Sequence, residues 1–169
     1  RETLEKLDDL RIVDEKVFLE FAAALKRQQG ENHVFFFYQR EYKPELNPKI
    51  VNQMFSLYQE NPQVLAGLQD LFQFYYRNIQ FDRNRIRQAF SDSSSVFNFI
   101  FMNKEPEFIS GITMREQSED IFSVFSEVAK ATGGIVDNSQ NPAHGFKSAL
   151  DASEAYYLIY YSPADYKKD

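Results

Sequence analysis

The chain has 169 residues, a net charge of -6 and no cysteine. Its length predicts one domain, and its 43% hydrophobic and 16% aromatic residues are enough for a buried core. The absence of cysteine excludes disulfides, thiol catalysis and cysteine-ligated metals. An acidic chain without basic clusters argues against nucleic acids and anionic membranes as partners. No apolar run reaches the roughly 18–20 residues that a membrane span needs.

The first elements alternate between charged and apolar segments. Residues 1–12 are highly charged and form a lead-in, and Asp14 is placed to cap a helix that ends near Gly30. The run 33–38 is apolar throughout and β-prone, which predicts a strand buried on both faces. Residues 39–46 are expected to form a loop.

Two Asn-Pro pairs mark helix starts in the middle of the chain. Asn47-Pro48 and Asn61-Pro62 each combine a capping side chain with proline at the first helical position. Apolar residues then follow at helical spacing, and the second helix is expected to reach Ile79. A short helix over 83–90 and a polar break at 91–94 come next.

The following segment repeats the pattern of strand and helix. Residues 96–102 predict a second buried strand, and 103–114 a loop. Ser118 is placed to cap a helix that ends at Thr132-Gly133-Gly134, before a very short strand at 135–136.

The last elements complete the expected fold. Residues 137–142 predict a loop, the apolar positions from Phe146 to Leu150 a brief helix, and 156–161 a final strand. Strands separated by helices indicate a layered α/β fold, helix-rich, whose mostly parallel sheet of few strands has helices on both faces. We expect a single domain over 13–163 and a polar tail over 164–169.

One family resemblance is carried by the last third of the chain. The helix end Phe125-Ser126-Glu127-Val128-Ala129-Lys130-Ala131-Thr132-Gly133-Gly134 resembles that of von Willebrand factor A domains, especially the bacterial A-like proteins. The strand Tyr156-Tyr157-Leu158-Ile159-Tyr160-Tyr161-Ser162-Pro163 is similar to their closing strand. Residues 25–38 resemble the helix and central strand of the same family. The resemblance implies a divergent or partial A-like domain, matching mainly the family's C-terminal half.

The family's first strand, which carries an Asp-x-Ser-x-Ser metal motif, has no counterpart before residue 33. The run 33–38 would normally pair with it, so here that run is expected at a sheet edge. The helices between Pro48 and Ile79, a second copy or a partner chain are the candidates to cover it. Because the chain begins with Arg1 and shows no signal peptide, we expect a processed piece of a longer protein, with export weakly favoured and the compartment unknown.

The family's metal site is not expected in this chain. Where the family has an Asp after the central strand, Gln39, Arg40 and Glu41 stand, and Arg40 would oppose a cation. Glu41 is expected to be a surface carboxylate. Asp92-Ser93-Ser94-Ser95-Val96 lacks the second serine and precedes a strand, so it is interpreted as a loop and cap.

No catalytic or cofactor motif is visible either. His33 is expected at a strand start and His144 in a turn, and neither has a metal-ligand spacing or a nucleophile pattern. Gly133-Gly134 follows a helix, so it is no phosphate loop and is expected to be a helix stop. We predict no cofactor, no metal and no enzyme activity.

Most aromatic residues have the spacing of core positions, but some are candidates for an interface. These candidates are Phe35, Phe37, Tyr75, Tyr76, Tyr157 and Tyr161. The leading hypothesis is a non-enzymatic protein–protein interaction or adhesion-type module, with self-association through Val34–Tyr38 or Val64–Ile79 as a corollary. The alternatives are a metal-dependent ligand-binding A domain whose motif half lies elsewhere, and an enzyme of unknown class. The identity of the partner is not encoded in any recognisable motif.

Overall fold

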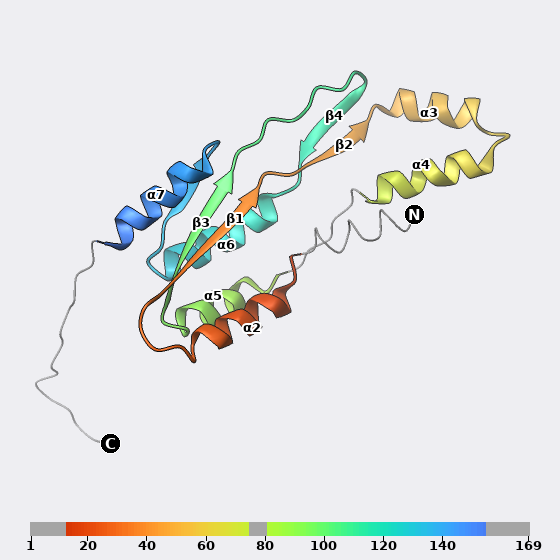
Figure 1. Cartoon of the computed structure of the whole chain (residues 1–169). Helices are drawn as coiled ribbons and strands as arrows, with labels where there is room; N and C mark the ends of the chain where they lie inside the picture. The colour runs from red at the N-terminus through yellow and green to blue at the C-terminus, as the bar shows by residue number, and fades with distance from the viewer. Residues whose placement is uncertain (1–12, 75–80, 155–169) are drawn as a thin grey trace, which may run out of the picture.

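A computed structural model describes residues 13–74 and 81–154 (Figure 1). The described helices are α2 (Glu15–Leu25), α3 (Pro48–Leu57), α4 (Pro62–Phe74), α5 (Arg83–Ser91), α6 (Glu119–Ala131) and α7 (Pro142–Ser153). The described strands are β1 (Asn32–Gln39), β2 (Tyr42–Leu46), β3 (Ser95–Met102), β4 (Ile112–Glu116) and β5 (Val136–Ser139). The expected strand at 156–161 and the end of the helix expected to reach Ile79 lie outside the described residues.

The main sheet has three parallel strands in the order β1-β3-β5. Its register pairs Phe36 with Phe99 and Phe99 with Val136. This arrangement confirms the layered, helix-rich α/β fold with a parallel sheet. It also confirms, for the described residues, that the run 33–38 forms an edge strand.

One face of the sheet carries the aromatic core. The helices α2, α5 and α6 pack on this face, where Phe125 of α6 is fully buried. Its ring lies 4.7 Å from that of Phe18, 4.6 Å from that of Phe36 and 5.7 Å from that of Phe97, measured between centroids. Phenylalanines at alternate positions of two parallel strands therefore build the core, as the β-strand period of two requires.

The other face of the sheet is covered by α7 (Figure 1). Gly145 packs against the side chains of Ile100 and Asp137, and Phe146 packs on Phe35 with ring centroids 4.8 Å apart. The predicted helices on both faces are thus confirmed. The brief helix expected around Phe146 is longer than predicted, since it runs from Pro142 to Ser153.

A second, antiparallel sheet pairs β2 with β4. The sequence had predicted a loop over all of β2 and over most of β4. The prediction of loops over 39–46 and 103–114 is therefore wrong in part. Lys43 pairs with Arg115 and Glu45 with Thr113, so charged side chains occupy much of this short ladder. The loop expected at 137–142 is also wrong in part, because β5 continues to Ser139.

The helix α3 continues from this small sheet, away from the main sheet, and α4 follows it (Figure 1). We call β2, α3, α4, β4 and the loop 103–111 the arm. Gly111 of the loop touches α3, since a Cβ built there would lie 2.7 Å from Cδ1 of Ile50.

Two turns have the roles that the sequence indicates. Gly133 ends α6 with a φ of +76°, and Gly134 then passes against the backbone of Phe97, where a side chain would not fit. Asp92 is the C-cap of α5, and the hydroxyl of the buried Ser93 donates to the carbonyl of Phe90 at 2.7 Å. The interpretation of 92–96 as a loop and cap is confirmed for residues 92–94, whereas Ser95 and Val96 already belong to β3.

Candidate functional site

A hollow of about 150 Å³ lies at the carboxyl edge of the main sheet. Each parallel strand contributes to it: Arg40 directly follows β1, Phe101 belongs to β3 and Asn138 to β5. Glu116 of β4 and Glu119 and Phe122 of α6 complete its wall. In open α/β sheets this is the edge at which ligands bind, because the loops that leave the strands meet there.

Arg40 contacts two other residues that line this hollow. Its Nε lies 3.3 Å from Oε1 of Glu116, and its guanidinium carbon lies 5.4 Å from the centroid of the Phe101 ring. The Nε atom is buried and not aligned for a hydrogen bond, so the contact with Glu116 is an ion pair without a directed N–H bond. The residue directly after β1 therefore places a cationic side chain of the protein itself in the wall of the hollow.

The hollow is joined to the small sheet through the buried Ser118. The Ser118 hydroxyl donates to Oε1 of Glu116 at 3.2 Å and accepts the N–H of Glu41 at 3.3 Å. Ser118 was expected to cap α6 through its side chain, but it makes no such bond. Instead its hydroxyl ties the β1–β2 connection to the start of α6, and Asp120 accepts the N–H of Ile121 at 2.8 Å.

The chemistry that these lining residues support is limited. Arg40 and the Asn138 amide are donors, and Glu116 and Glu119 are acceptors, so the wall suits a polar group that both accepts and donates. Among the described residues, no hydroxyl, thiol, imidazole or amine side chain lines the hollow. Within 13–74 and 81–154, no group of three or more His, Asp or Glu residues is placed to hold a metal ion.

The two histidines lie on separate elements. His33 is at the start of β1, as expected, with Nε2 3.6 Å from Oε1 of Glu31. His144 was expected in a turn, but it lies in the first turn of α7, where its backbone N–H donates to Oδ1 of Asn141 at 3.3 Å.

Of the six predicted interface residues, two are described. Phe35 is half-buried and Phe37 is 41% exposed, and both face α7, where Phe146 contacts them. The remaining four (Tyr75, Tyr76, Tyr157 and Tyr161) lie outside the described residues or their described side chains.

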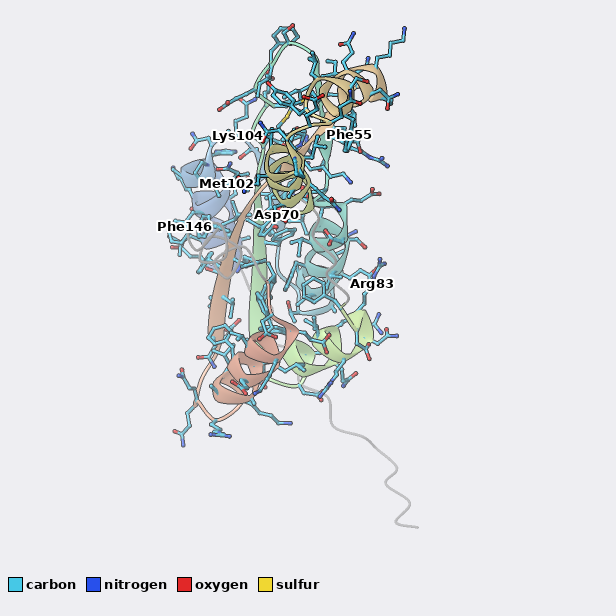
Figure 2. The ribbon with its side chains drawn as sticks, turned by 90° about the vertical axis from the view of Figure 1, so that its right-hand side faces the viewer. Phe55, Asp70, Arg83, Met102, Lys104 and Phe146 are labelled. Carbon is cyan, nitrogen blue, oxygen red and sulfur yellow. The ribbon has the colours of Figure 1, made fainter. Side chains whose placement is uncertain are left out.

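Another exposed apolar surface lies on the arm. Its helix α4 overlaps Val64–Ile79, one of the two segments predicted for self-association, but the exposure of α3 was not predicted. No residue of α3 is buried, although its apolar stripe predicted a core-facing helix. Exposed fractions reach 53% for Phe55, 77% for Leu57 and 95% for Phe108 of the neighbouring loop. Figure 2 shows Phe55 on α3 and Phe146 on α7 in separate parts of the molecule, so the arm and the α7 face are different surfaces.

No family model, no curated protein and no solved structure matches this chain. The resemblance to von Willebrand factor A domains stays a prediction. In the part of the chain that is described, no helix has the length and apolarity to cross a bilayer.

Proposed function

We propose that this chain is a non-enzymatic protein–protein interaction module and that the arm is its contact surface. The observation that carries the proposal is the helix α3, which is amphipathic yet has no buried residue. A soluble monomer rarely exposes several large apolar side chains on one element, and such patches mark interaction sites.

The physical reason lies in the stability of an isolated helix. A helix of 10 residues is marginal in water, and most of its stability in proteins comes from packing of its apolar face. Within the described residues, Phe55, Leu57 and Tyr58 keep 53%, 77% and 40% of their surfaces exposed. Covering this surface with another protein would supply the packing that α3 lacks.

We propose that the partner is a second copy of the chain. The whole chain carries a net charge of -6, which opposes self-association. Residues 48–74 have only Lys49, Glu60 and Asp70 as charged residues, so the α3–α4 parts of two arms can meet without strong repulsion. A twofold arrangement would place the same apolar face on both sides of the contact.

Light scattering over a concentration series tests this proposal. We expect the apparent mass to rise from monomer to dimer between about 1 µM and about 1 mM, the range of weak to moderate affinity. The double variant Phe55→Ser, Leu57→Ser should remain monomeric over this range. A matched control is Phe146→Ser on α7, which is 41% exposed and should associate like the unmodified chain. A mass that stays monomeric for the unmodified chain would refute self-association through the arm.

A further inference from the structure

The hollow at the carboxyl edge of the main sheet has a size that limits what it can hold. Its volume of about 150 Å³ is well below the 300–1,000 Å³ of sites that bind drug-sized molecules. A cavity of about 150 Å³ is large enough for benzene. An occupant of the hollow therefore has on the order of ten non-hydrogen atoms, the size of a small metabolite.

Arg40 brings hydrogen-bond donors to this hollow that the described part of the chain does not use. Its ion pair with Glu116 is closest through Nε, and its terminal nitrogens Nη1 and Nη2 donate no hydrogen bond to a described residue. The side chain is only 28% exposed, and its guanidinium lies over the Phe101 ring, which restricts its conformation. The planar fork of a guanidinium matches the two oxygens of a carboxylate. Arg40 is therefore placed to bind the carboxylate of a small ligand.

Two carboxylates in the same wall offer acceptors for a positive group. Glu119, the first residue of α6, is exposed and makes no hydrogen bond or ion pair with a described residue. Glu116 uses Oε1 for its contacts with Arg40 and Ser118, and its Oε2 accepts no hydrogen bond from a described residue. Carboxylate oxygens form strong charge-assisted hydrogen bonds with an ammonium group. The glutamates therefore suit a ligand that carries an amine.

The balance of charges in the wall selects a ligand with both signs. A simple anion would pair with Arg40 but would be repelled by Glu116 and Glu119, and a simple cation would be repelled by Arg40. A zwitterion gives each of these side chains an opposite charge. The rest of the wall includes the rings of Phe101, which is buried, and Phe122, which is half-buried. These rings suit a short apolar group between the charged ends of the wall.

We propose that the hollow binds a free α-amino acid with a small apolar side chain. The terminal nitrogens of Arg40 hold its carboxylate, Glu116 and Glu119 accept hydrogen bonds from its ammonium group, and its side chain contacts the phenylalanine rings. The amide of Asn138, which also lines the hollow, can donate to the carboxylate. Binding here does not require contact between two arms, because no described residue of α3 or α4 lines the hollow.

Titration of the full chain with L-leucine, followed by the NMR shifts of the amides of Arg40, Phe101 and Asn138, tests this proposal. We expect saturable shifts with a Kd of about 0.1–10 mM, the range for a ligand of so few atoms. N-acetyl-L-leucine lacks the ammonium group and L-leucinamide lacks the carboxylate, so each should bind at least about tenfold more weakly. Shifts that do not saturate, or equal affinities for the three compounds, would overturn the proposal.

Two variants assign the ends of the ligand, and the comparison of the three compounds on the unmodified chain stands even where a variant fails to fold. Arg40→Gln should weaken L-leucine at least about tenfold without weakening L-leucinamide, which has no carboxylate to lose. Glu119→Gln should weaken L-leucine without weakening N-acetyl-L-leucine. Glu127→Gln, elsewhere on α6 and outside the wall, is the control and should bind L-leucine like the unmodified chain. Equal weakening of L-leucine and L-leucinamide by Arg40→Gln would overturn the assignment of the carboxylate to Arg40.

Discussion

Replacing Gly134 by alanine should destabilise the protein strongly, because this glycine fixes how closely the turn after α6 approaches β3. A Cβ at Gly134 would overlap the carbonyl oxygen of Phe97 and lie 2.6 Å from the carbonyl carbon. Both atoms belong to the backbone of a buried strand, so the turn itself must move. Overpacking typically costs 1–3 kcal/mol, and the rigid neighbour places this substitution at the upper end, about 3 kcal/mol.

Movement of the turn would also weaken hydrogen bonds that define the junction. The N–H of Gly134 donates to the carbonyl of Ala129 and that of Phe99 to the carbonyl of Ile135, each at 2.9 Å. At about 1 kcal/mol for each bond, the total loss reaches about 4–5 kcal/mol. For a chain of this size, that corresponds to a fall in Tm of roughly 10–15 °C.

Urea unfolding followed by circular dichroism measures this loss, and two other glycines supply matched controls. Gly133 has a φ of +76° but open space around it, so Gly133→Ala should cost only about 1–2 kcal/mol of left-handed strain. Gly67 lies in α4 with nothing near it, and Gly67→Ala should stabilise by up to about 1 kcal/mol. If Gly134→Ala is no more destabilising than Gly133→Ala, the close approach of the turn to β3 is wrong.

Three further measurements test other parts of the structure. Asn98 is buried and accepts the N–H of Ile135 at 3.1 Å, so Asn98→Leu should lower the free energy of unfolding by about 1–3 kcal/mol in urea titrations. A double-mutant cycle between Arg40 and Glu116 should give a coupling below about 1 kcal/mol that decreases with added salt, because the pair is partly exposed. Phe125→Ala should cost about 3–5 kcal/mol, whereas Phe108→Ala, at a side chain that is 95% exposed, should change stability by less than about 0.5 kcal/mol in thermal unfolding.

The main sheet could be predicted from sequence because its strands are continuous apolar runs. Residues 33–38 and 96–102 are buried-type segments bounded by polar turns, and the structure forms β1 and β3 there. The strands β2 and β4 were missed for the opposite reason. Both are short and partly charged, β2 also contains Pro44, and each is stabilised by a partner about 70 residues away in the chain.

The candidate site could be predicted only in part. Arg40 was identified as a residue that opposes a cation, because its position after a buried strand follows from the sequence alone. Its partner Glu116 could not be predicted, since it lies 76 residues later at the end of a strand that had no sequence signal. Contacts between distant polar segments depend on the fold and not on local periodicity.

The helix α3 of the arm shows that an apolar stripe in the sequence does not reveal whether that side of the helix is buried. The stripe that contains Phe55 and Tyr58 correctly predicted a helix, but the expectation that such a stripe faces the core was wrong for α3. Helical periodicity identifies which side of a helix is apolar. It does not identify what covers that side.

Cross-linking through single introduced cysteines is the most direct test of the proposal that two copies meet through the arm. The chain has no cysteine of its own, so a disulfide can form only at the introduced position. Ser56→Cys places a thiol between Phe55 and Leu57 on α3, and Arg83→Cys places one at the start of α5 (Figure 2). Under mild oxidation, we predict disulfide-linked dimers for the Ser56→Cys chain at concentrations where the Arg83→Cys chain remains monomeric. Equal cross-linking of both chains, or none at Ser56→Cys, would contradict the proposal that two copies meet through the arm.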